Sequence, residues 1–203
     1  MKSIRLDSND IYPSKIVCIG RNYVDHIMEL GNEVPKEPVF FLKPNSALSD
    51  VVCSGQSEVI HFEGEISFVV ISGRLAAVGF GLDLTKREIQ TRLKDKGLPW
   101  ERSKAFDRSA VFSQFVSFKG DMSALRLELH IDDQLVQKGG YALMINKPDK
   151  ILKEATSFLT LEDGDVIMTG TPAGVGPIHP GDRLVGKVFD NETLVVEGRW
   201  TVN

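Results

Sequence analysis

The sequence predicts a β-rich α+β fold in which short helices decorate packed or rolled sheets. Short β-branched or alternating apolar runs recur along the chain, separated by turn residues, whereas helical signals are fewer. The 203 residues are 42% apolar and 26% charged, as in a typical folded globular protein. No repeat or linker divides them, so we expect one domain over residues 1–203.

Eight runs carry the strand signal. In the clearest of them apolar and polar residues alternate, which predicts that one face of a sheet is shared by Leu125, Leu127, Leu129 and Ile131. The expected strands are Lys15–Ile19, Pro38–Leu42, Val59–Ile71, Leu125–Ile131, Gln134–Gln137, Asp165–Thr169, Arg183–Phe189 and Leu194–Val202.

Three segments carry helical signals. Asn22 is a plausible N-cap of the first, and Thr85 with Glu88 has the capping-box spacing at the start of the second. A proline opens the third. The expected helices are Val24–Leu30, Thr85–Lys96 and Pro148–Ser157.

Charge and hydropathy exclude several classes of protein. The formal net charge is −4 and the basic residues are scattered, which argues against nucleic-acid binding. Apolar stretches such as Ile66–Ile71 are far shorter than the ~20 residues of a membrane-spanning helix. Met1–Arg5 lacks the apolar core of a secretion signal. We expect a cytoplasmic protein without a nucleic-acid or membrane partner.

Three acidic residues form the first candidate site. Glu63 and Glu65 lie two residues apart in a predicted strand, so both project from the same face, about 6.5–7 Å apart. Such like charges repel unless solvent or a cation neutralises them. Asp83 lies at a predicted strand-to-helix junction, where side chains face a crevice. The set suits a hard cation such as Mg²⁺ or Ca²⁺; an exposed strand end and a turn aspartate are the alternatives.

His26 and Glu29 form the second candidate site. They lie at positions i and i+3 of a predicted helix and therefore share a face. A carboxylate beside an imidazole orients it and raises its basicity, as a general base acting on water requires; a solvent-exposed helical turn is the alternative. Farther along, the glycine-rich loop Thr169–Pro177 offers backbone N–H groups that could hold a carboxylate.

Other catalytic templates are absent from the sequence. There is no G-x-x-x-x-G-K-[ST] loop, and Gly79-Phe80-Gly81 lacks the third glycine of a dinucleotide-binding fingerprint. H-E-x-x-H and G-x-S-x-G are also missing, and no cysteine–histidine cluster has zinc spacing.

Taken together, the order of these motifs resembles the fumarylacetoacetate hydrolase family. The resemblance covers nearly the whole chain and is closest to the small single-domain branch of acylpyruvate hydrolases and oxaloacetate decarboxylases. The matching segments are G-R-N-Y-V-D-H-I-M-E (20–29), P-V-F-F-L-K-P (38–44), H-F-E-G-E (61–65), D-L-T-K-R-E-I-Q (83–90), G-L-P-W-E-R-S-K-A-F-D (97–107) and L-E-D-G-D-V-I-M-T-G-T-P-A-G-V-G-P (161–177).

The resemblance implies a role for each motif residue. The ligands of Mg²⁺ or Mn²⁺ would be Glu63, Glu65 and Asp83. The water-activating and polarising groups would be His26, Glu29, Arg87, Gln90 and Lys104. Substrate contacts would come from Arg21, Tyr23 and Thr171. The implied fold is a mixed β-roll, usually assembled as a homodimer.

The implied activity is metal-dependent hydrolysis of the C–C bond in acylpyruvates or related 2,4-dioxo acids, such as fumarylpyruvate, through an enolate of pyruvate. Oxaloacetate decarboxylation, or decarboxylation or isomerisation of oxo acids from aromatic breakdown, needs the same metal site and stays open as an alternative. A catalytically silent protein that binds a metal or carboxylate is the third. Gly31–Lys36, beyond His26, is a candidate lid.

Two features depart from the family pattern. The segment between Glu65 and Asp83 is short, which predicts a reduced peripheral hairpin or loop and could alter the dimer contact. Gly64 replaces a bulkier residue, and a glycine in a strand is expected to loosen local packing.

Overall fold

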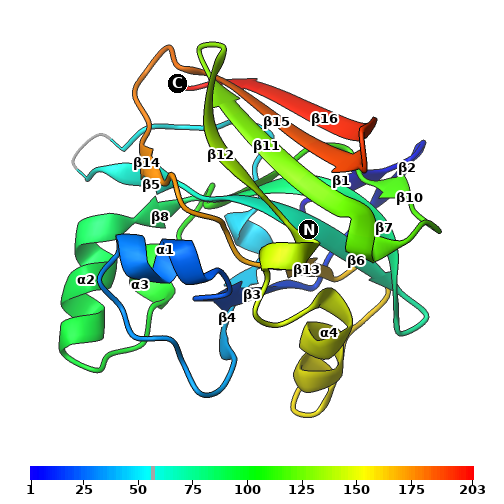
Figure 1. Cartoon of the computed structure of the whole chain (residues 1–203), viewed down its shortest axis with the longest axis horizontal. Coiled ribbons are helices and arrows are strands. Elements are labelled where there is room, and N and C mark those ends of the chain that lie inside the picture. Colours follow the sequence, from blue (N-terminus) through cyan, green and yellow to red (C-terminus); the bar gives the residue numbers. More distant parts are fainter. Residues whose placement is uncertain (56–57) are drawn as a thin grey trace.

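The computed structural model describes residues 1–55 and 58–203, and its largest element is a mixed sheet of seven strands (Figure 1). These strands are β3 (Lys15–Gly20), β4 (Val39–Pro44), β6 (Gly64–Ile71), β7 (Arg74–Asp83), β9 (Ala110–Phe112), β10 (Val116–Ser117) and β13 (Val166–Met168). Their order is β10-β7-β6-β13-β3-β4, and β9 also pairs with β7. The pair β13–β3 is parallel, whereas its neighbours are antiparallel.

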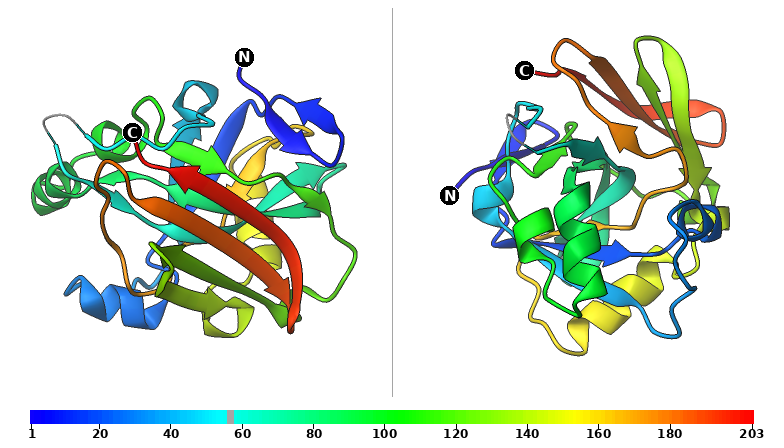
Figure 2. Two further views of the ribbon diagram at one scale, coloured as in Figure 1. Left: turned by 90° about the horizontal axis from the view of Figure 1, so that it is seen from above. Right: turned by 90° about the vertical axis from the view of Figure 1, so that its left-hand side faces the viewer.

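A second, antiparallel sheet covers β6 and β7, so that the two sheets form a roll (Figure 2). Its strands are β11 (Leu125–Ile131), β12 (Gln134–Gly140), β15 (Arg183–Asp190) and β16 (Thr193–Thr201), in the order β12-β11-β15-β16. As predicted, Leu125, Leu127 and Leu129 point to one side, where they are buried against Ile66 and Phe68 of β6. The predicted β-rich α+β class is confirmed.

Smaller elements close the ends of the roll. They are the hairpin β1 (Ile4–Leu6) and β2 (Asn9–Ile11), a sheet of β5 (Ile60–Phe62), β8 (Thr85–Lys86) and β14 (Gly176–Pro177), and three short 3₁₀ turns, Asn45–Ala47, Met122–Ala124 and Tyr141–Leu143. The helices are α1 (Val24–Glu29), α2 (Arg87–Asp95), α3 (Glu101–Lys104) and α4 (Pro148–Thr156). The first three gather at one end of the roll, and α4 packs on β3 and β13 (Figure 1).

Helix α2 begins two residues later than predicted. Thr85 and Lys86 pair with β5 instead, so the predicted capping box of Thr85 and Glu88 is wrong. The Thr85 hydroxyl donates to the carbonyl oxygen of Asp83 at 3.2 Å rather than capping the helix. Tertiary pairing has overridden a local signal here.

Asn22 does not cap α1 as predicted. Tyr23 occupies the N-cap position, while the buried Asn22 amide donates to the carbonyl oxygens of Asn146 and Thr169 at 2.9 and 2.8 Å. Asn22 thus joins the start of α1 to two distant segments.

The predicted strand over Val59–Ile71 is two strands in different sheets. The chain leaves β5 at Phe62, passes through Glu63 and enters β6 at Gly64. The short segment that follows is the hairpin predicted from its length. Ser72 and Gly73 form its turn with φ of 51° and 70°, the left-handed values that tight hairpin turns require.

Gly64 tightens the packing, contrary to the expectation from sequence. A Cβ atom there would lie 2.8 Å from the Phe80 ring and 3.0 Å from Oε1 of Gln137. Gly186, on β15, also makes room for the Phe80 ring. A Cβ atom at Gly186 would lie only 2.3 Å from that ring. The two glycines let Phe80 fill the core between the sheets.

Within the residues that the structure describes, no helix has both the length and the apolar character needed to cross a membrane.

Asp165 anchors β13 to the start of β3. Its buried carboxylate accepts hydrogen bonds from the backbone N–H and hydroxyl of Ser14 at 2.9 and 2.8 Å and from the N–H of Lys15 at 3.0 Å. It also pairs with the Lys15 ammonium. Burial opposes ionisation, but the hydrogen bonds from Lys15, Glu162 and Ser14 outweigh it and lower the pKa of Asp165.

We predict that Asp165→Asn lowers the free energy of unfolding by about 2–4 kcal/mol at neutral pH, because the buried donors lose a charged acceptor. The stabilisation exists above the unfolded-state pKa of about 3.9 and is lost as the pH falls through the lower folded-state value. Urea unfolding at several pH values measures both effects. Asp10→Asn, at an exposed ion pair with Arg5, is the control and should change little; equal effects would contradict the assignment.

Candidate active site

The three predicted acidic residues converge at the junction of β5, β6 and β7. Gly64 of β6 pairs with Leu82 of β7. Just beyond this pair, the Asp83 N–H donates to the carbonyl oxygen of Glu63 at 2.9 Å. This register sets Asp83 opposite Glu63, with Glu65 two residues along β6. Carboxylate oxygens of Glu63, Glu65 and Asp83 lie within 4.8 Å of one another, and all three residues are buried.

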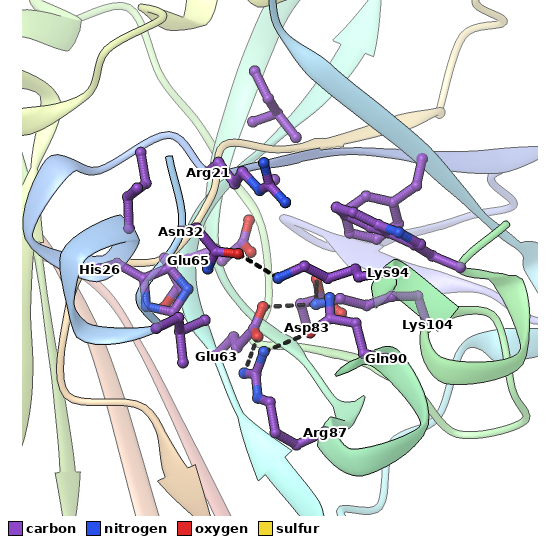
Figure 3. Close-up of a pocket in the computed structure, with 17 residues that line it drawn as sticks. Arg21, His26, Asn32, Glu63, Glu65, Asp83, Arg87, Gln90, Lys94 and Lys104 are labelled. Atoms are coloured by element: carbon purple, nitrogen blue, oxygen red, sulfur yellow. Dashed lines mark hydrogen bonds and ion pairs between the residues drawn. The ribbon is translucent and has the colours of Figure 1, made fainter. Parts of the chain in front are cut away.

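Three basic side chains compensate two of these acids, and Figure 3 shows two of the three, Lys104 and Arg87. The Lys104 ammonium lies 2.7 Å from both Glu63 and Asp83, and the Lys43 ammonium lies 2.8 Å from the other oxygen of Asp83. The Arg87 guanidinium pairs with Glu63. Burial opposes the charge of Glu63, but Lys104 and Arg87 together lower its pKa. Likewise, Asp83 and Glu63 overcome the effect of burial and raise the pKa of Lys104.

Glu65 is the uncompensated member of the set. Its carboxylate accepts the Gly170 N–H at 2.6 Å, and among the described residues no lysine or arginine lies within ion-pair distance of it. Burial, followed by the charges of Asp83 and Glu63, raises its pKa well above the usual range. Hard oxygen donors with unmet negative charge fit a divalent cation.

His26 and Glu29 form the dyad expected on α1. The Nδ1 atom of buried His26 lies 3.0 Å from Oε2 of Glu29, and Oε1 of Glu29 accepts the Gly174 N–H at 2.9 Å. Because the carboxylate engages Nδ1, the proton resides there and Nε2 is the basic nitrogen. In the structure, the backbone N–H groups of the glycine-rich loop bind carboxylates of the protein itself, those of Glu65 and Glu29.

A small cavity, partly open to solvent, connects the acids with His26 of the dyad. Six of the other predicted site residues line it: Arg21, His26, Arg87, Gln90, Lys104 and Thr171. Oε1 of Gln90 accepts a hydrogen bond from Arg87 at 2.6 Å. The Thr171 hydroxyl donates to the carbonyl oxygen of Gly64 at 3.0 Å, so it is fixed beside the acids.

Tyr23 does not line this cavity, so the structure gives no support to the predicted substrate contact. It is 2% exposed and belongs to the main hydrophobic core, with its ring 3.2 Å from where a Cβ of Gly139 would be. Burial, with the nearby charge of Glu65, raises the pKa of its hydroxyl, which has no hydrogen-bond partner among the described residues. The position of Tyr23 within the polar motif Gly20–His26 hides this core role from sequence analysis.

Sequence analysis also missed Lys43 and Gln137. Lys43 is completely buried, and besides Asp83 its ammonium contacts the carbonyl oxygen of Ser109 at 3.0 Å. Its one signal is a lysine within the apolar run of residues 38–44. Gln137, on β12, receives the Gly64 N–H at 2.8 Å and donates to Thr171 at 2.8 Å. Nothing local marks it, because its partners come from other sheets.

Comparison with known proteins identifies the family. Residues 15–198 match the family model described as fumarylacetoacetate (FAA) hydrolase, C-terminal. The chain belongs to the fumarylacetoacetate hydrolase family. The resemblance seen in the sequence motifs is thus confirmed, and the chain belongs to a family of enzymes.

Relatives within the fumarylacetoacetate hydrolase family carry several activities in their names. The chain is 39% identical to oxaloacetate tautomerase YcgM of Escherichia coli, over 90% of this chain and 92% of that protein. It matches a candidate fumarylacetoacetate isomerase/hydrolase structure from Oleispira antarctica with a TM-score of 0.95 and 33% identity, covering both chains completely. It also matches the fumarylpyruvate hydrolase of Pseudomonas aeruginosa in complex with Mn²⁺ and pyruvate, with a TM-score of 0.87, 26% identity and coverage of 100% and 96%.

We predict that Glu65→Gln lowers the affinity for Mn²⁺ by about 10- to 100-fold, because one of three hard anionic ligands becomes neutral. This change leaves no lysine or arginine without its partner, so the fold should survive. Titration of free Mn²⁺ by electron paramagnetic resonance measures the affinity. Glu88→Gln, exposed on α2, is the control and should bind as the wild type does; an unchanged affinity for Glu65→Gln would exclude this site.

Proposed function

We propose that this protein is a divalent-metal-dependent enzyme that interconverts the keto and enol forms of oxaloacetate. The observation that carries the proposal is the pairing of the His26–Glu29 dyad with the acidic set across one small cavity. Further support comes from relatives at 34–42% identity that are named oxaloacetate tautomerases. We expect Mg²⁺ or Mn²⁺ as the cation; the Pseudomonas neighbour is named as a Mn²⁺ complex.

The cation would be held by Glu63, Glu65 and Asp83, where it would polarise the 2-keto group and stabilise negative charge on its oxygen. The chain's own residues would bind and orient the substrate. Thr171 lines the cavity, and its hydroxyl would exchange its hydrogen bond to the carbonyl oxygen of Gly64 for one donated to the 1-carboxylate. Arg87 fixes the Gln90 side chain, whose amide N–H₂ is then left to donate to the substrate.

His26 would move the proton. Its Nε2 accepts a proton from C3 of the keto form, and the 2-oxygen gains one, so that the enol forms with no net change in atoms. Glu29 holds Nδ1 and stabilises the imidazolium that forms in between. The Lys104 ammonium adds positive charge beside the reacting oxygen.

Hydrolysis of acylpyruvates is the second candidate, and the same dyad favours it. His26 would then deprotonate a water that attacks the distal carbonyl, and Lys104 with Gln90 would stabilise the oxyanion. Decarboxylation of oxaloacetate needs no attacking water and should depend less on His26.

The oligomeric state we propose is a homodimer, and the protein is proposed to act in the cytoplasm; some relatives are named as mitochondrial.

We predict that the wild-type protein with Mg²⁺ accelerates ketonisation of enol-oxaloacetate, followed by the loss of enol absorbance. His26→Ala should lower this rate by about 10²- to 10⁴-fold, since it removes the general base, while Mn²⁺ affinity stays unchanged. Chelation of the metal should abolish the activity.

His179→Ala is the matched control, because His179 is exposed in a loop outside the cavity. Parallel assays with acetylpyruvate and fumarylpyruvate test hydrolysis, and release of CO₂ tests decarboxylation. Cleavage of an acylpyruvate without tautomerisation would replace the first proposal with the second. A metal-loaded protein that turns over none of these acids would be a silent binding protein.

A further inference from the structure

The outer end of the cavity carries positive charge that the acidic set does not neutralise. Arg21 and Lys94 line this end, and among the described residues neither lies within ion-pair distance of an acidic side chain. Figure 3 shows Lys94 extending from α2 across the cavity toward Asn32, with Arg21 beside it. No step of the proposed proton transfer uses Lys94.

Arg21 is held in place by a costly backbone conformation. Its φ is 55°, in the left-handed region that residues other than glycine seldom adopt. Its Nε atom is buried and has no hydrogen-bond partner within the described part of the chain. A strained residue that lines a cavity and carries an unsatisfied buried donor indicates a binding role.

Lys94 is held by a neutral partner. Its ammonium donates to Oδ1 of Asn32, in the segment after α1, and this contact orients the charge without cancelling it. Burial, together with the charges of Arg21 and Arg87, lowers the pKa of Lys94. An anion at this point would relieve the repulsion among these cations and satisfy the free donors.

We propose that Lys94, together with Arg21, binds the second carboxylate of a four-carbon 2-oxo dicarboxylic acid and thereby selects dicarboxylic over monocarboxylic substrates. This inference rests on the proposed function, because it takes the 2-oxo acid end of the substrate to lie at Glu63, Glu65 and Asp83. The second carboxylate of the substrate would then lie toward the mouth of the cavity, close to the side chains of Lys94 and Arg21.

The test compares two acids that differ only at the far end. Oxaloacetate ends in a carboxylate, and 2-oxobutanoate has a methyl group in its place. Lys94→Met keeps the length of the side chain and removes its charge. It should raise the KM for oxaloacetate about 10- to 100-fold with a much smaller effect on kcat, since a charge-assisted contact to the ground state is lost. The inhibition constant of 2-oxobutanoate should change less than about twofold.

Lys96→Met is the matched control, because Lys96 lies on the same helix end, exposed and outside the cavity. Asn32→Asp is a second variant with the same expected pattern, because it places a permanent carboxylate beside Lys94 that competes with the substrate. Equal weakening of both acids by Lys94→Met, or no weakening of either, would overturn the inference.

Binding to the Mn²⁺-loaded protein, measured by water proton relaxation, separates this inference from the proposed function. A wild-type protein that prefers oxaloacetate and loses that preference in Lys94→Met supports the carboxylate site even where no tautomerisation is found. If the wild-type protein tautomerises oxaloacetate but binds both acids equally well, the proposed function stands and the proposed carboxylate site at Lys94 and Arg21 is wrong.

Discussion

Burial of three carboxylates within 4.8 Å of one another is the constraint on which the rest of the structure depends. In a low-dielectric interior such a group is strongly unfavourable unless positive charge and hydrogen bonds surround it. The chain supplies them from distant segments: Lys43 from β4, Arg87 from α2 and Lys104 from α3. The strand and the two helices that carry these residues are therefore fixed around the acids.

Basic side chains compensate the charges of two of the three acids but not that of Glu65. Glu63 and Asp83 have ion-pair partners, whereas Glu65 has the Gly170 N–H. Each carboxylate oxygen has two lone pairs, so an oxygen that already accepts from Lys104 can also bind a cation. The site can thus fold before the cation arrives, and Glu65, whose raised pKa favours the protonated form until then, would release its proton when the cation binds.

Some features of the fold and the site can be predicted from the sequence, and others cannot. Strands such as Leu125–Ile131 were predicted with their bounds, because alternation along one strand is a local property. The convergence of Glu63 and Glu65 with Asp83 followed from motif order, but the break of the strand at Glu63 did not, since it depends on pairing of β5 with β8. Lys43 and Gln137 escaped notice for the same reason: their roles arise from neighbours 40 to 73 residues away, such as Asp83 and Gly64.

The distribution of charge along the cavity gives it a direction. One part of the cavity is lined by the acids, which would hold the proposed cation and, through it, the 2-oxo acid group. Another part is lined by Arg21 and Lys94, which have no acidic partner among the described residues. In the proposed orientation, C3 of the substrate would face His26, which lines the cavity together with the acids. Charge placement can therefore enforce both the choice of substrate and the carbon from which a proton is taken.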